Sequence, residues 1–139
     1  MVQLLLFLPL ILRFTSTYMR KIIVVDDNED ILEIIKLILE GYDYEVVTLA
    51  DGGLLFDCIR EFKPDLILLD IMLGNMDGRE LCKAMREKDE TKDIPVIFVS
   101  ASHSLSDRFI AMGSNVDFLA KPFDINELID KVEMSLSAA

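Results

Sequence analysis

The amino-acid sequence predicts a single doubly wound α/β domain built on a parallel sheet of five strands. Short apolar runs alternate along the chain with stretches whose apolar residues recur every three to four positions, as they do in amphipathic helices. The run at residues 66–69 contains no polar position, which indicates a central strand with helices on both faces. A chain of 139 residues, of which 52% are hydrophobic, can bury the core that such a domain needs.

Five apolar runs are interpreted as strands because each is short and rich in β-branched or aliphatic residues. The run that follows the first helical pattern is the most polar of them, which favours an outer position in the sheet. The predicted strands are residues 22–25, 45–49, 66–70, 96–99 and 116–120.

The helices between these strands are predicted from apolar spacing and from residues that favour helix ends. The first should end just before Gly41 and bury Ile31, Ile34, Ile35 and Ile38. The second should end at Pro64 and bury Leu54, Leu55, Cys58, Ile59 and Phe62. The third should start at Asp77 and bury Leu81, Ala84 and Met85. A short helix is expected at residues 106–112, and a last one after Asp124 should bury Leu128, Val132 and Leu136.

Residues 1–19 differ from the rest of the chain, so the domain is expected to comprise residues 20–139. The stretch 2–12 is almost wholly apolar, but it is shorter than the roughly 20 residues that span a bilayer, and Pro9 interrupts it. No positive charge precedes it as in a signal peptide, and Met19 with the two basic residues after it looks like a start of translation. We expect an apolar extension from a misassigned start and no membrane span. An interfacial anchor or an extra packed segment is the alternative.

Charge and cysteine content argue against several classes of partner and cofactor. The net charge of −11 opposes binding to nucleic acid, and no basic cluster reverses it locally. Cys58 and Cys82 belong to no C-x-x-C pair or metal cluster, which favours two free thiols in a reducing, cytoplasmic compartment. His103 is the only histidine and cannot form a metal site alone.

Polar side chains follow the predicted strands where each strand ends. Because parallel strands with right-handed crossovers bring their carboxyl ends to one edge of a sheet, these side chains should share one cleft. They are Asp26, Asp27, Asp70, Ser100 and Lys121. Three carboxylates in one place repel one another unless a cation lies between them, and a small set of hard oxygen ligands suits Mg²⁺. A lysine and a hydroxyl can stabilise the oxygens of a phosphoryl group.

The acidic residues and the lysine also have simpler interpretations. Asp70 could be a turn residue at the end of a strand, since aspartate is favoured in turns. Either Asp26 or Asp27 could cap the helix that follows, and Lys121 could be a solvated surface residue. Capping does not explain why both acidic residues should lie next to Asp70.

Four motifs in order closely resemble the receiver domains of response regulators in two-component signalling. They are the pair Asp26-Asp27, Asp70, the pair Ser100-Ala101, and the triplet Lys121-Pro122-Phe123, at spacings typical of that family. The resemblance covers residues 20 to about 137. It implies the flavodoxin-like strand order 2-1-3-4-5 and a cis peptide bond before Pro122, which base rates alone would make improbable.

The resemblance also implies a role for each residue of the site. Asp70 would be the phosphoacceptor, and Mg²⁺ or Mn²⁺ would be held by Asp26, Asp27, Asp70 and the main-chain carbonyl of Met72. Ser100 and Lys121 would each bind a phosphoryl oxygen. Ser100 would also form a switch with Phe118, the aromatic residue three positions before the lysine, although a place in the core explains Phe118 equally well.

The function implied by the resemblance is that of a single-domain response regulator rather than a conventional enzyme. Asp70 would take its phosphoryl group from a histidine kinase or a histidine phosphotransfer protein. A surface formed by the fourth helix, fifth strand and fifth helix would then signal to a downstream protein. The same surface could form a homodimer.

Three other functions fit the sequence less well. A receiver-like docking module without phosphorylation would not need the acidic site and Lys121. An aspartate-nucleophile phosphatase needs an acid/base carboxylate close to the nucleophile, commonly at the position that Met72 occupies. An FMN-binding module needs a phosphate loop rich in Ser, Thr or Gly after the first strand, where residues 26–30 are acidic.

The chain departs from the family pattern after the phosphoacceptor. The turn there often reads Met-Pro-Gly-Met-Asp-Gly in the family, whereas Gly74 stands at the proline position here, which should loosen the turn and could alter metal affinity. Met72 and Ser102 occupy positions that in the family influence how water attacks the acyl phosphate. His103 could meet a partner, although a loop histidine without a role is the favoured interpretation.

Overall fold

The computed structural model describes residues 19–101 and 115–138 and contains the expected parallel sheet. Five strands pair side by side in the order β2-β1-β3-β6-β7. They are β1 (Lys21–Val25), β2 (Glu45–Leu49), β3 (Leu66–Asp70), β6 (Val96–Ser100) and β7 (Val116–Ala120). Counted in chain order this is 2-1-3-4-5, so the predicted fold class, strand order and strand positions are confirmed.

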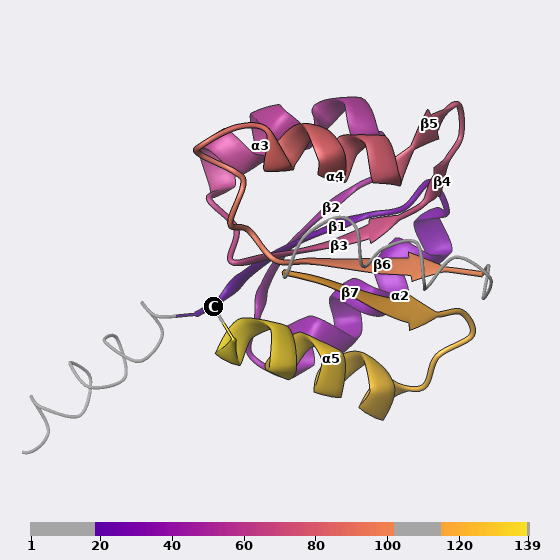
Figure 1. Cartoon of the computed structure of the whole chain (residues 1–139). Helices are drawn as coiled ribbons and strands as arrows, with labels where there is room; N and C mark the ends of the chain where they lie inside the picture. Colours follow the sequence, from indigo (N-terminus) through magenta and orange to yellow (C-terminus); the bar gives the residue numbers. More distant parts are fainter. Residues whose placement is uncertain (1–18, 102–114, 139) are drawn as a thin grey trace, which may run out of the picture.

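Helices cover both faces of the sheet in two layers (Figure 1). One face is covered by α2 (Glu29–Gly41) and α5 (Ile125–Ser137), and the other by α3 (Leu55–Phe62) and α4 (Gly78–Arg86). Alternate residues of each strand face opposite layers, so that Ile22 packs toward α2 and α5 while Ile23 packs toward α3 and α4. Every residue of β3 is buried, as its central position requires.

The buried face of α2 differs from the predicted one. Leu32, Ile35 and Leu39 are buried, whereas Ile34 is 55% exposed. The helix carries apolar residues around much of its circumference, and Leu32, Ile35 and Leu39 have the same i, i+3, i+7 spacing as the predicted set. Periodicity alone therefore could not choose between them. Leu54 was also predicted to be buried, but it lies in the short 3₁₀ helix η1 (Gly52–Leu54) and is exposed.

Polar residues cap the starts of three helices. Asn28 caps α2 by accepting from the backbone N–H groups of Asp30 and Ile31, so neither Asp26 nor Asp27 is the cap. Asp77 caps α4 and Asp124 caps α5, as predicted from the sequence. The capping interpretation of the first two aspartates is thus wrong, and Asp26 instead accepts from the backbone N–H of Asn28 at 2.9 Å.

A two-stranded hairpin that was not predicted follows β3. It consists of β4 (Met72–Leu73) and β5 (Met76–Asp77), joined by a two-residue loop that begins with Gly74. The φ angle of Gly74 is 62°, which suits the first loop position of a type II′ turn and which proline cannot adopt. Glycine at this position therefore shapes the hairpin rather than only loosening the turn.

Some predictions concern residues outside the described ranges. These are the apolar extension at residues 1–18, the helix at residues 106–112, and the roles of Ser102 and His103. The surface expected to signal or dimerise includes that helix, so only its β7 and α5 parts are described. Within the described residues, none of the helices has the length and apolar character needed to cross a membrane.

Candidate functional site

A hollow of about 460 Å³ lies at the carboxyl ends of the sheet strands and contains six of the predicted site residues. It is lined by Asp26, Asp27, Asn28, Ile31, Asp70, Met72, Ser100, Ala101 and Lys121. β1, β3 and β6 each end beside it, and the segment after β7 closes it. The sheet therefore brings together side chains that are up to 95 positions apart in the sequence.

Three carboxylates form the centre of this hollow. Asp26 and Asp27 follow β1 and Asp70 is the last residue of β3, and one carboxylate oxygen of each lies within 4.8 Å of the others. Asp26 and Asp70 are 2% and 7% exposed, whereas Asp27 is open to solvent. The site thus combines two buried charges with one that an incoming group can reach.

Lys121 supplies a positive charge on the buried side of the cluster. Its Nζ lies 2.7 Å from Oδ2 of Asp26 and 3.4 Å from Oδ2 of Asp70. Its backbone N–H donates to the carbonyl of Ser100 at 2.8 Å, which fixes the segment after β7 against the end of β6. The peptide bond between Lys121 and Pro122 is cis, as the resemblance implied.

Burial and the closeness of these charged groups shift the pKa values of Asp70 and Lys121. Burial, and then the negative charge of Asp26, raise the pKa of Asp70 above its ordinary value, while Lys121 acts in the opposite direction. Burial lowers the pKa of Lys121, but its hydrogen bond to Asp26 and the charges of Asp26 and Asp70 raise it overall. One ammonium group faces three carboxylates, so the cluster retains an excess of negative charge that a cation would relieve.

The β4–β5 hairpin and the start of α4 hold the open side of the cluster. The backbone N–H of Gly74 donates to Oδ2 of Asp27 at 3.1 Å, and that of Met72 lies 3.3 Å from Oδ1 of Asp70. A Cβ atom on Gly78 would lie only 2.0 Å from the carbonyl oxygen of Asp70. The backbone N–H contacts of Met72 and Gly74 and the close approach of Gly78 were missed because the hairpin was not predicted. A Gly-Asn pair between two short apolar runs was the available sequence evidence.

Ser100 and Phe118 occupy different surroundings. Ser100 ends β6, is 3% exposed and lines the hollow beside the carboxylates. Phe118 lies within β7, is half-buried, and packs against the core beneath α3 and α4. The packing of Phe118 agrees with a core role, and its part in a switch stays a prediction.

Comparison with known proteins gives one family. The family model described as response regulator receiver domain matches residues 22–133. The nisin biosynthesis regulatory protein NisR of Lactococcus lactis subsp. lactis is 42% identical over 118 residues, which cover 84% of this chain and 50% of that protein. The chain therefore spans about half the length of this curated relative.

Solved structures with the same fold include two bacterial examples. The chemotaxis protein CheY4 of Vibrio cholerae has a TM-score of 0.77 and 28% identity, with coverage of 85% of this chain and 99% of that one. The receiver domain of the Francisella response regulator 1452 has a TM-score of 0.76 and 31% identity, with coverage of 86% and 98%. The strand order and the matched range agree with these likenesses.

Proposed function

The chain belongs to the response regulator receiver domain family of two-component signalling, and from this premise we propose that it is a switch whose Asp70 accepts a phosphoryl group. One observation carries the proposal: Lys121 bridges Asp26 and Asp70 inside a hollow where three carboxylate oxygens lie within 4.8 Å of one another. Such an arrangement offers a nucleophile, a place for a metal ion and a fixed positive charge side by side.

The donor set of this hollow fits Mg²⁺. All three candidate side-chain ligands are carboxylates, and one of them, Asp27, is exposed. Mg²⁺ prefers oxygen ligands and keeps several waters, so a partly open site of this kind suits it, and Mn²⁺ can replace it. We propose Asp26, Asp27 and Asp70 as ligands, together with the main-chain carbonyl of Met72. A bound divalent ion would supply positive charge for the oxygens of the transferred phosphoryl group.

The proposed transfer uses the side chains in distinct roles. An ionised oxygen of Asp70 attacks the phosphorus of a phosphohistidine on a partner protein; the new O–P bond forms as the P–N bond breaks, and the imidazole leaves. Lys121 stabilises negative charge on the phosphoryl oxygens, and Asp26 holds its ammonium group in place. The Ser100 hydroxyl donates to another of these oxygens. Asp70 itself keeps the phosphoryl group at the end of this step, so the domain acts as an acceptor rather than as a conventional enzyme.

The proposed partners are a histidine kinase or a histidine phosphotransfer protein on the input side and a target protein on the output side. We propose that phosphorylation changes the surface around Phe118, β7 and α5, and that the same surface allows homodimerisation. We expect no direct binding to nucleic acid, because the net charge of −11 opposes binding to a phosphate backbone. Its two cysteines are free thiols, which fits a cytoplasmic location.

A phosphatase reaction has little support from the site. The position two residues after the proposed nucleophile is held by Met72, whose side chain is exposed and cannot transfer a proton. An aspartate-nucleophile phosphatase needs an acid/base carboxylate close to the nucleophile, commonly at this position.

The proposal can be tested with acetyl phosphate and with beryllofluoride. The full chain should gain the mass of one phosphoryl group from acetyl phosphate only when Mg²⁺ is present, and Asp70→Asn should gain none. Beryllofluoride with Mg²⁺ should shift the amide resonances of Ser100 and Phe118 in the wild type alone. A chain that binds neither Mg²⁺ nor beryllofluoride would refute the proposal and leave a docking module.

A further inference from the structure

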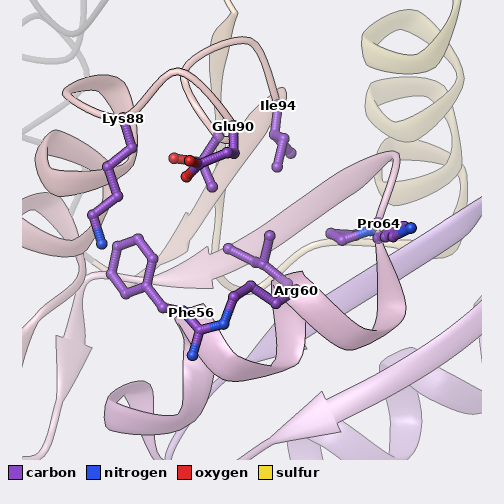
Figure 2. A pocket seen from close by; sticks show the side chains of 9 residues that line it. Phe56, Arg60, Pro64, Lys88, Glu90 and Ile94 are labelled. Atoms are coloured by element: carbon purple, nitrogen blue, oxygen red, sulfur yellow. The ribbon is translucent and has the colours of Figure 1, made fainter.

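A second and larger cavity, of about 760 Å³, lies at the opposite end of the sheet (Figure 2). It is lined by Phe56, Ile59, Arg60, Lys63, Pro64, Lys88, Glu90, Thr91 and Ile94. Pro64 lies two residues before β3 and Ile94 two residues before β6, so the cavity adjoins the amino ends of these strands. Asp70 terminates the same β3 strand at its other end, and none of the residues around Asp70 lines this cavity.

The cavity has an apolar floor and a mainly basic rim. Phe56, Ile59 and Ile94 contribute apolar surface, while the rim carries Lys63 and Lys88 against the single carboxylate of Glu90. Arg60 also lines the rim, but its guanidinium pairs with Asp57. This excess of positive charge occurs on a chain whose net charge is −11. The local excess of positive charge on the rim suits an anionic partner at short range, although the rest of the surface would repel such a partner at long range.

Hydrogen bonds fix the walls of the cavity from inside. The hydroxyl of buried Thr91 donates to the carbonyl of Met85 at 2.6 Å, and Nη1 of Arg86 donates to the carbonyl of Ile94 at 2.8 Å. On the other wall, the backbone N–H of Lys63 donates to the carbonyl of Ile59 at 2.9 Å and ends α3. A preformed pocket of this kind loses little conformational entropy when it binds a ligand.

The positions of the cations indicate the shape of the ligand. Lys88 lies at one end with its Nζ 4.0 Å from the centre of the Phe56 ring, and Lys63 precedes Pro64, which lies at the other end (Figure 2). A compact ligand with one negative charge would meet only one of these ends. An extended segment with an apolar centre and a carboxylate on each side would meet both.

We propose that this cavity binds an acidic peptide segment of a partner protein, in which carboxylates flank an apolar anchor. The apolar anchor covers Ile59 and Ile94, and the flanking carboxylates pair with Lys63 and Lys88. Because the cavity and the acidic hollow lie at opposite ends of β3, the segment can bind whether or not Asp70 carries a phosphoryl group. The inference therefore stands apart from the proposed phosphorylation.

The test uses a synthetic hexapeptide, acetyl-Glu-Asp-Leu-Leu-Asp-Glu-amide, titrated into the ¹⁵N-labelled full chain. The backbone amides of Phe56, Ile59, Lys88 and Ile94 should shift in a saturable manner, and binding should weaken at high salt. A peptide with Lys in place of each acidic residue and one with Ser in place of each Leu are the matched controls, and neither should shift these amides.

Charge-reversal variants locate the binding. Lys63→Glu and Lys88→Glu should each weaken binding of the acidic peptide by about tenfold, or roughly 1.4 kcal/mol, since each reversal replaces an attraction between opposite charges with a repulsion between like charges. Lys83→Glu makes the same change at an exposed position of α4 outside the cavity and should leave the affinity within about twofold. All three variants should still be phosphorylated by acetyl phosphate, because none of these lysines lines the acidic hollow.

The outcomes separate the alternatives. Absence of shifts with the acidic peptide, equal binding of the lysine peptide, or equal loss in Lys83→Glu would each overturn the proposal. If the serine peptide binds as well as the leucine peptide, the rim attracts anions only and the cavity is not the binding site. If the wild-type chain binds the acidic peptide but is not phosphorylated by acetyl phosphate, the proposed role of Asp70 is contradicted and the proposed peptide site is not.

Discussion

The two ends of the sheet carry opposite charge although they belong to the same strands. The carboxyl ends open into a hollow dominated by carboxylates, and the amino ends adjoin a cavity with a mainly basic rim. Helix direction contributes to this contrast. α2 begins at the carboxyl ends with Glu29 and Asp30 in its first turn, whereas α3 and α4 end at the amino ends with basic residues in their last turns. Each arrangement is favoured by the helix dipole.

The free-energy cost of carrying charge also differs between the two ends of the sheet. At the carboxyl ends, Asp26 and Asp70 are buried around one lysine, so their ionisation opposes folding until a cation balances it. At the amino ends the lysines are exposed and remain hydrated. The first end is suited to chemistry that changes charge, and the second to recognition. Four substitutions test this contrast, from the largest expected effect to the smallest.

Gly78→Ala should cause the largest loss. A Cβ atom at this position would lie 2.0 Å from the carbonyl oxygen of Asp70, and backbone atoms cannot move aside as a flexible side chain can. We expect the free energy of unfolding in urea to fall by on the order of 3 kcal/mol. Gly41→Ala is the control, since no heavy atom lies within 4 Å of its Cβ position. It should be neutral or stabilising, and equal losses in both variants would contradict the close approach as the cause.

Lys121→Met should lower the free energy of unfolding by about 2 kcal/mol at neutral pH. It leaves Asp26 and Asp70 without their shared cation, although water in the hollow can hydrate them in part. Lys131→Met removes the ion pair between Lys131 and Asp117, whose side chains are each 35% exposed, and should cost less than about 1 kcal/mol. If the two variants lose equal stability, the buried and exposed charges do not differ as described.

Asp70→Asn should stabilise the metal-free protein at neutral pH. Burial raises the pKa of Asp70 in the folded state, so unfolding releases a proton between its ordinary pKa of 3.8 and the raised value, and stability falls as pH rises through this window. The asparagine variant lacks this loss, and its advantage should shrink as pH falls toward 3.8. Urea unfolding at several pH values with a chelator measures the difference. An advantage that grows at low pH would show that the pKa is lowered instead.

Lys63→Gly should have the smallest effect and the opposite sign. Lys63 ends α3 with a φ angle of 54°, a left-handed conformation that glycine adopts without strain. We expect stabilisation of about 0.5 kcal/mol, measured by urea unfolding, together with weaker binding of the acidic peptide. Lys83→Gly, inside α4, should instead destabilise by about 1 kcal/mol. Stabilisation in both variants would rule out backbone strain as the reason.

Much of the fold and the site could be predicted because it depends on residues that are adjacent in the sequence. Each strand is a mainly apolar run that can be recognised in the sequence without knowing which residues pack against it, as residues 66–69 illustrate. The site residues stand directly after these runs, so placing the strands in parallel also placed Asp26, Asp70 and Lys121 together. The cis bond before Pro122 came from the resemblance and not from local physics.

By itself, then, the sequence determined the five strands, the fold class, and the collection of acidic and basic groups at the carboxyl edge, because apolar runs and the polar residues that end them are adjacent in the chain. Tertiary structure alone decided that α2 buries Leu32 rather than Ile34, that Gly78 lies against Asp70, and that two distant segments enclose a cavity with a mainly basic rim. These features depend on contacts between different helices, strands and turns, and apolar spacing along one helix or strand contains no information about the element that packs against it.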